Sequence, residues 1–349
     1  MRLLTRDDFD GLVCATLLTE KGVVDEYKFV HPRDVQNNAV EVTADDVLAN
    51  VPYAKGCGLW FNHHSSEQER LQLKELEYEG DSRSAKSSAQ VIWDYYGGVK
   101  TFGENMLSLL EAVNKYDSAD LTLDEILHAE EWIMLAFIID PRTGLSEYTD
   151  FSIGNEQFVR DLIQYCRTKT IQEILEIPDV KERANRYNEQ QILFKDMLRR
   201  CTDSDRNVVI TNLLNEETIY CGNRFIVFAS HPDQNIEIRL GWDKGKENVL
   251  ISCGHSILNR TSKTNVGELM FKYGGGGHER AGSCRVSSSE WEKALNEILE
   301  KMKEDANSEI IYQESRLLSN IINQSAFNFS VKIKNRWPLV PMSGADLLG

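Results

Sequence analysis

The chain has 349 residues, of which 41% are hydrophobic and 27% charged, and its formal net charge is −16. This length allows two domains, each with its own core. The acidic balance disfavours avid binding to long nucleic acid, which needs basic surface to displace counterions, but it leaves room for a small anion in a local basic pocket.

Targeting and disulfide signals are also lacking. The sequence has no run of about 18 apolar residues that would predict a membrane span. The opening stretch MRLLTRDDFDG meets acidic residues too early for a signal peptide. The seven cysteines include no CxxC pair, which argues against a disulfide framework and a thiolate zinc site. We therefore expect a cytoplasmic protein without a membrane partner.

The first 150 residues alternate between strand-like and helix-like segments. Expected strands are 1–5, 26–30, 47–51 and 58–61, and helical stretches are 12–22, 87–96, 105–120 and 123–140. This alternation predicts a parallel sheet with both faces covered. Ligands of such sheets gather at the carboxyl ends of the strands. Polar clusters at 6–10, 50 and 62–64 follow three of the expected strands, which is the first functional signal.

The pattern changes after this region. Residues 155–203 predict a connecting pair of charged helices, and β-rich segments follow at 207–213, 218–222, 224–230, 236–242 and 248–254. Helices at 265–274 and 289–304 flank a glycine run and a strand at 284–287. We divide the chain into residues 1–150, a helical linker at 151–204, a smaller domain at 205–303 and a C-terminal extension at 304–349. The end of that extension, 338–349, is expected to be mobile.

Two carboxylates follow the first strand. Asp8 and Asp10 are two residues apart on a turn, and Gly11 permits a sharp entry into the next helix. Carboxylates at this spacing can each hold one of two hard divalent cations about 4 Å apart. Alternatively, they are acids that favour the start of a helix through its dipole.

The adjacent His63 and His64 end another strand. One of them can bind a metal while the other meets a substrate phosphate, although a purely structural role is equally open. Asp117 and Asp120 follow a helical stretch in NKYDSAD. A solvated helix end is the ordinary interpretation of these two, and their interest comes only from the other clusters.

The stretch GGGGHERAGSC, which begins at residue 274, is the most specific pattern. Flexible linkers are the usual explanation of glycine runs, but here the run lies between a helix and a strand. Bare backbone N–H groups at such a place can form an anion-binding nest beside cationic side chains. The residues expected to contact the anion are Gly275, Gly276, Gly277, His278, Arg280 and, upstream, Arg260.

Together, DxDG, a strand ending in a His pair, a later Asp and a helix leading to GGGGHERAG resemble the DHH phosphoesterases with a C-terminal DHHA1 domain. The resemblance covers about residues 1–303, and TRDDFDGLVCA and GCGLWFNHHSSE are most similar to the exopolyphosphatase-related branch. It implies an α/β fold: an N-terminal parallel-sheet DHH domain and a smaller α/β DHHA1 domain, joined by a helical linker. It also implies hydrolysis of phosphoester or phosphoanhydride bonds by metal-activated water.

The resemblance implies a role for each candidate. Asp8 and Asp10 match the metal carboxylates of the first motif, His63 matches the metal-ligating histidine, and Asp117 matches the carboxylate of the fourth motif. The remaining matches are His64 with the histidine that faces the scissile phosphate, His278 and the preceding glycines with the substrate clamp, and Arg260, more weakly, with a basic residue of DHHA1. One or two Mn²⁺ or Mg²⁺ ions are implied as cofactor.

Three positions depart from the family pattern. Residues 1–10 contain no histidine, although many members bind metal with one there, and Arg6 is the nearest basic residue. Asn50 takes the place of a bridging carboxylate, so it remains only as a weak metal ligand and the second metal should suffer most. Asn62 replaces the first residue of the DHH signature, where loss of a carboxylate that orients the ligating imidazole typically costs roughly 10–100-fold. Three carboxylates and one histidine suit one hard metal better than two.

Two hypotheses stay open. The first is a working phosphoesterase with an altered centre, acting on a short oligonucleotide, a nucleotide or polyphosphate. The second is a catalytically impaired pseudo-enzyme that binds a nucleotide or polyphosphate as a sensor or partner subunit. A processive exonuclease on long DNA is disfavoured by the acidic balance, whereas a short single-stranded nucleic acid as substrate and a homodimer are both left open.

Overall fold

The computed structural model describes residues 1–64, 77–243 and 245–306. Its first sheet has five parallel strands in the order β2-β1-β3-β4-β5. The strands are β1 (Arg2–Thr5), β2 (Glu26–Phe29), β3 (Asp46–Ala49), β4 (Leu59–Asn62) and β5 (Gly80–Ser82). The expected parallel α/β fold is confirmed. Strand β5 was not expected, because Gly, Asp and Ser have low strand propensity and pairing with β4 alone creates it.

Helix α1 (Phe9–Glu20) is the centre of this part of the molecule. Every residue from Phe9 to Leu18 is buried, because α1 packs among α4, α6 and α9. The other helices here are α2 (Pro32–Gln36), α4 (Ser88–Tyr95), α5 (Val99–Phe102), η2 (Glu104–Met106), α6 (Leu107–Asp117), α7 (Leu123–Leu127), α8 (Glu131–Ile139), η3 (Pro141–Thr143) and η4 (Leu145–Glu147). The buried helix therefore fixes its own first turn, which follows β1, in a rigid setting.

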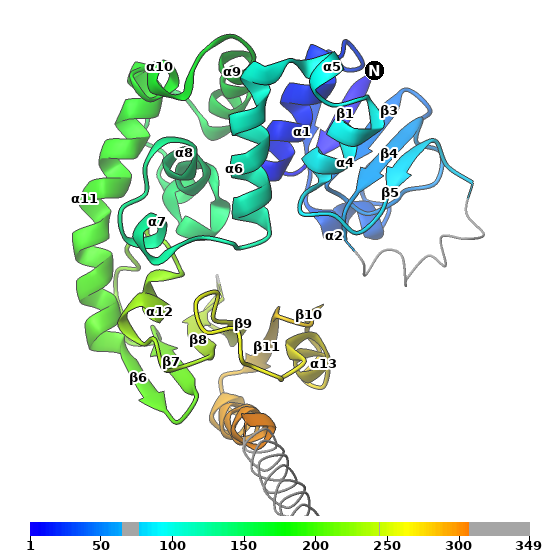
Figure 1. Ribbon diagram of the computed structural model, residues 1–349. Coiled ribbons are helices and arrows are strands. Elements are labelled where there is room, and N and C mark those ends of the chain that lie inside the picture. The colour runs from blue at the N-terminus through cyan, green and yellow to red at the C-terminus, as the bar shows by residue number, and fades with distance from the viewer. Residues whose placement is uncertain (65–76, 244, 307–349) are drawn as a thin grey trace, which may run out of the picture.

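The connecting region contains three helices rather than the expected pair: α9 (Asn155–Thr168), α10 (Ile171–Leu175) and α11 (Pro178–Cys201). The division follows from local signals, since Thr170 and Glu173 form a capping box and Pro178 starts α11. Helix α11 runs from α10 to β6 along one side of the molecule (Figure 1). Its buried Tyr187 and Phe194 belong to the same core as α1, so these helices are part of the first core.

The second sheet has six strands in the order β10-β11-β9-β8-β7-β6. They are β6 (Thr202–Asp205), β7 (Val208–Asn212), β8 (Ile236–Trp242), β9 (Asn248–His255), β10 (Gly276–His278) and β11 (Ala281–Ser287). Within the described residues, only β7 and β8 pair in parallel in this sheet. Helix α13 (Val266–Phe271) and a helix at 291–306 cover the sheet and share its core through Met270 and Ile298.

Two expected β segments are not strands. Residues 218–222 have no regular structure, and 224–230 contain helix α12 (Ile226–Ser230). A short apolar run does not distinguish a strand from a buried helix. Here Asn223 decides, because its side chain accepts the Phe225 N–H at 2.9 Å and donates to the Ile126 carbonyl at 3.1 Å. The helix is thereby tied to the first core.

The end of the chain at 338–349, which we expected to be mobile, lies outside the described residues. Among the residues that the structure describes, no helix has the length and apolar content needed to cross a membrane.

Candidate metal centre and phosphate site

The polar clusters come together at the carboxyl ends of three adjacent strands. Asp8 and Asp10 follow β1, Asn50 follows β3, and His63 and His64 follow β4. Asp117 reaches the same place from the last turn of α6. Strand order therefore joins residues that are far apart in the sequence.

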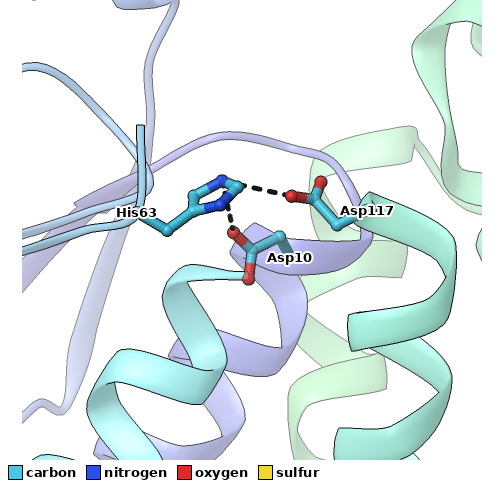
Figure 2. A group of neighbouring side chains, drawn as sticks. All are labelled: Asp10, His63 and Asp117. Carbon is cyan, nitrogen blue, oxygen red and sulfur yellow. Dashed lines mark ion pairs between the residues drawn. The ribbon is translucent and has the colours of Figure 1, made fainter. Parts of the chain in front are cut away.

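Asp10, His63 and Asp117 form a compact group whose ligand atoms all lie within 4.8 Å of one another. The Nε2 atom of His63 is 3.1 Å from Asp117 Oδ2 and 3.8 Å from Asp10 Oδ2 (Figure 2). Asp10 is only 1% exposed and is fixed by the N-terminus of α4, whose Ser88 and Ala89 N–H groups each donate to it at 2.9 Å. The carboxylate thus has a defined orientation before any ligand arrives.

The tautomer of His63 suits metal binding. Its Nδ1 atom is 3.3 Å from the Ala85 carbonyl oxygen, which can only accept, so Nδ1 carries the proton. Nε2 is buried without a hydrogen-bond partner and faces the carboxylates of Asp117 and Asp10. A neutral imidazole held in this way is the form in which histidine binds metals.

Among the described residues, the acids of this group form ion pairs with His63 and with no arginine or lysine. Burial raises the pKa of Asp10 above its usual range, and the charge of Asp8 adds to this while His63 opposes it. Burial, followed by the charge of Asp10, raises the pKa of Asp117 to about 7. Both shifts report negative charges crowded in a place with little water. A cation bound between them would remove this penalty.

Asp8 has different partners. Its Oδ1 atom caps α1 by accepting the Gly11 N–H at 3.0 Å, and it also accepts the Asn50 amide at 3.0 Å. Its Oδ2 atom pairs with the Arg6 guanidinium at 2.9 Å. A Cβ atom on Gly11 would lie 2.0 Å from the Arg6 carbonyl oxygen, so only glycine allows this turn.

Asn50 occupies the left-handed region, with φ of 58°, a conformation that asparagine tolerates better than most residues. While its amide nitrogen donates to Asp8, its Oδ1 atom is buried and has no hydrogen-bond partner. A buried, unsatisfied carbonyl is costly unless a water or an ion meets it. Asn50 therefore has a free neutral oxygen at the edge of the acidic group.

Asn62 orients His64 rather than His63. Its Oδ1 atom accepts the His63 backbone N–H at 2.9 Å, which identifies it as the oxygen, and it lies 2.8 Å from His64 Nδ1. This differs from the expectation that position 62 supports the ligating imidazole, since the Ala85 carbonyl orients that ring. Burial, then His63, His278 and Arg6, lowers the pKa of His64 to about 2.

The second sheet contributes His278 to the same place. The rings of His64 and His278 are stacked, with centroids 5.7 Å apart. The glycine run is not a free loop, because Gly276–His278 is strand β10, paired with β11. A Cβ on Gly275 or Gly277 would lie 2.1 Å or 2.3 Å from a carbonyl oxygen of β11, so close strand pairing requires these glycines.

The two expected arginines have different surroundings. Arg260 donates to the Ala119 carbonyl at 2.6 Å and lies 3.9 Å from Asp120, so it ties the second sheet to the turn that follows Asp117. Arg280 is exposed in the turn between β10 and β11, where its carbonyl oxygen accepts the His255 N–H at 2.9 Å. Arg260 thus bridges from the second sheet to the turn after α6, whereas Arg280 is an exposed residue beside β9.

Sequence reasoning missed a basic group centred on Asp140. This buried carboxylate accepts two hydrogen bonds of 2.7 Å from Arg142 and one of 2.7 Å from the Tyr116 hydroxyl, and Arg224 is 3.7 Å away. Burial alone would raise the pKa of Asp140, but Arg142, Arg224 and the Tyr116 hydroxyl together outweigh burial and hold this pKa well below its usual range. The only signal was Asp-Pro-Arg after an apolar helix, and nothing in the spacing pointed to Arg224.

The donor set fits a hard divalent cation. Two carboxylates and an imidazole converge, and the imidazole Nε2 has no hydrogen-bond partner. Asn50, whose amide donates to Asp8, adds an unpartnered Oδ1 atom after the neighbouring strand β3. Among the described residues, this is the one group of three or more such side chains whose ligand atoms all lie within 4.8 Å of one another. Asp8 differs in that one of its three donors is the Arg6 guanidinium. Within the part of the chain that the structure describes, Asp10 accepts only from neutral groups, the Ser88 and Ala89 N–H groups and the Cys14 thiol.

Comparisons with known proteins bear on this centre. No protein-family model and no curated protein matched the chain. Among solved structures, the pGpG-specific phosphodiesterase PggH from Vibrio cholerae is 41% identical, with a TM-score of 0.75 over 87% of this chain and 99% of its own. An exopolyphosphatase-related protein from Bacteroides fragilis is 13% identical, with a TM-score of 0.48 over 86% of this chain and 91% of its own. RecJ from Thermus thermophilus, in complex with Mg²⁺, is 12% identical, with a TM-score of 0.46 over 87% of this chain and 50% of its own.

Proposed function

Because the chain belongs to the DHH family of phosphoesterases, which makes it a hydrolase, we propose that it cleaves the phosphodiester bond of short linear dinucleotides such as pGpG. The proposal rests on PggH, which is named for pGpG and whose whole chain this one nearly covers. The observation that carries it is the convergence of Asp10, His63 and Asp117. The working-enzyme hypothesis is therefore favoured over the pseudo-enzyme.

Asp10, His63 and Asp117 would hold a divalent ion, with the Asn50 oxygen as a neutral addition. When bound, Mn²⁺ or Mg²⁺ lowers the pKa of a coordinated water and neutralises phosphoryl oxygens. The contribution of the chain is to hold the carboxylates and the imidazole in place. The α4 N–H groups fix Asp10, and the Ala85 carbonyl fixes His63.

His64 is suited to a phosphate that approaches the centre. It is neutral in the free protein, its Nδ1 proton is held by Asn62, and its Nε2 atom therefore carries a lone pair. An anionic phosphate beside the ring would favour the protonated form. The imidazolium could then donate its Nε2 proton to a phosphate oxygen or to the departing oxygen.

Histidine and arginine side chains other than His64 would bind the rest of a dinucleotide. His278 lies against His64, and Arg142 and Arg224 share a single carboxylate, Asp140, which leaves one positive charge in excess. Arg224 is about one-third exposed, so it can meet a phosphate. The predicted contacts of Gly275, Gly276, Gly277, Arg260 and Arg280 belong to the same proposal.

The test measures product release from pGpG, pApA, 3′-phosphoadenosine 5′-phosphate, cyclic dinucleotides and polyphosphate with Mn²⁺. We expect pGpG or pApA to be cleaved fastest. Asp10→Ala should reduce kcat/KM by more than about 100-fold, beyond the loss typical of a residue that only supports a ligand. The control is Asp7→Ala, which removes a neighbouring but exposed carboxylate and should retain activity.

Other outcomes contradict the proposal in distinct ways. Preferential release of phosphate from polyphosphate would replace the dinucleotide substrate. Tight binding of pGpG without turnover, lost in His278→Ala, would instead support the pseudo-enzyme. Location in the cytoplasm and dimerisation remain predictions, which fractionation and light scattering would address.

A further inference from the structure

Arg6 lies beside the metal centre in an unusual role. Its guanidinium is 2.9 Å from Asp8 Oδ2, and this side chain is about one-third exposed while that of Asp8 is almost fully buried. Asp8 Oδ1 accepts two further hydrogen bonds, from Gly11 and Asn50. Both oxygens of this carboxylate are therefore already satisfied by the protein.

A second metal ion next to Asp8 would have to share this carboxylate with the Arg6 guanidinium and the Asn50 amide. The Asn50 amide directs N–H hydrogens toward Asp8, and such donors repel a cation. The residue brings no negative charge, and the first ten residues contain no histidine. By contrast, among the described residues no arginine or lysine forms an ion pair with Asp10 or Asp117, whose oxygens lie with His63 in one set of ligand atoms. The two sides of the centre thus differ in what they can bind.

The charges agree with this division. Asp8, Asp10 and Asp117 together with the Arg6 guanidinium leave two negative charges, which a single divalent ion balances. A second divalent ion would leave an excess of two positive charges before any substrate is bound. The Arg6 side chain is about one-third exposed, so the N–H groups that do not pair with Asp8 can reach a ligand.

We infer that Arg6 takes the place of a second metal ion, so that the chain binds one divalent ion per molecule and uses Arg6 to neutralise Asp8 and hold a phosphate oxygen. This inference rests on the metal centre of the proposed function. Arginine is suited to it because its planar guanidinium is always charged and has N–H groups to spare after pairing with one carboxylate. Unlike a metal ion, it stays in place when chelators are added.

The experiment counts Mn²⁺ ions bound to the full chain by titration calorimetry and by electron paramagnetic resonance. The wild-type chain should bind one ion and give the spectrum of isolated Mn²⁺. The double variant Arg6→His, Asn50→Asp restores a histidine and a carboxylate, so it should bind two ions with the spectrum of an exchange-coupled pair about 4 Å apart. Arg6→Gln should tighten binding of the single ion about tenfold, since a nearby positive charge is removed.

Arg2→Gln is the matched control. Arg2 is 33% exposed, against 32% for Arg6, and pairs with the buried Asp46 at 2.7 Å, on the far end of β1. It should bind one ion with unchanged affinity. Two coupled ions in the wild-type chain would overturn the inference, as would no bound ion. A folded double variant that still binds one ion would also contradict it. Activity on pGpG is measured separately, so a chain that binds two ions and cleaves pGpG would refute this inference alone.

Discussion

Two adjacent residues at the end of α6, Tyr116 and Asp117, belong to two different groups of side chains. One group is centred on Asp140 and the other contains Asp10, His63 and Asp117, and the two have opposite electrostatics. Tyr116 donates to Asp140, whose negative charge is more than balanced by Arg142 and Arg224. Asp117 faces Asp10 across His63, and its pKa is raised to about 7 by burial and by that neighbouring charge. The first group carries its counter-charge within the protein, whereas the second must obtain it from solution. A group of the first kind stabilises the fold, and one of the second kind binds a ligand at a cost in stability.

The largest effect on the free energy of unfolding is expected from removing the negative charge of Asp140. Asp140→Asn leaves Arg142 and Arg224 close together without their carboxylate, so we expect a loss of about 3–5 kcal/mol in the free energy of unfolding. Urea denaturation in the presence of a chelator measures it. Asp94→Asn breaks an exposed pair with Arg83 and should cost less than about 1 kcal/mol. Equal losses in the two variants would contradict the comparison.

Asp140 also sets the direction of a pH effect. Because its folded pKa is depressed, its contribution to stability is present above the unfolded value near 4 and is lost as the pH falls through the folded value.

The opposite sign is expected at Asp117. Its folded pKa is raised, so its contribution in the metal-free protein is most favourable below about pH 4 and declines as the pH rises toward about 7. Asp117→Asn should therefore stabilise the chelated protein at about pH 8 by about 1–3 kcal/mol, with no gain at about pH 4. Thermal or urea unfolding at the two pH values measures this. A variant that is destabilised at the higher pH would contradict the comparison.

Bound metal should reverse the order of stability of the wild-type chain and the Asp117→Asn variant. Mn²⁺ at about 100 times its Kd should stabilise the wild-type chain by about 2.7 kcal/mol, and the Asp117→Asn variant by much less.

The smallest change in stability is expected from placing a new carboxylate at position 62, beside His64. Asn62→Asp converts the neutral Asn62–His64 contact into a charged pair, which resembles the Asp140 group on a smaller scale. We expect the pKa of His64 to rise by about 1–3 units from its value of about 2, because a negative charge favours imidazolium. NMR titration of the histidine signals measures the shift, and Asn62→Ala serves as the uncharged control. An unchanged His64 signal would show that the two side chains do not interact.

Much of the first sheet could be predicted, because β1, β3 and β4 are short apolar runs that end in polar clusters. We could also predict that these polar clusters lie at one edge of the sheet, because ligands of parallel sheets gather at the carboxyl ends of the strands. The partners of each side chain could not be predicted in this way. That Asn62 orients His64, and that Asp8 pairs with Arg6, depends on rotamers and turns that residue spacing does not encode.

Long-range partners were the hardest to anticipate. Arg224 comes from the segment that was expected to be a strand, and it reaches Asp140 only because α12 packs on the first core. This packing, together with the hydrogen bonds of Asn223, favours helix over strand for this segment. Local propensity was overruled by burial, as is common for short apolar runs.

Gly11 has no chemistry of its own, yet it constrains the centre more tightly than several charged residues do. Any side chain there would collide with the carbonyl of Arg6 and push apart the turn that holds Asp8 and Asp10. In a library of variants selected for turnover, position 11 should accept glycine alone, while the exposed Asp7 nearby accepts many residues. The mutational tolerance of this turn is therefore set by a backbone oxygen atom rather than by the metal ligands.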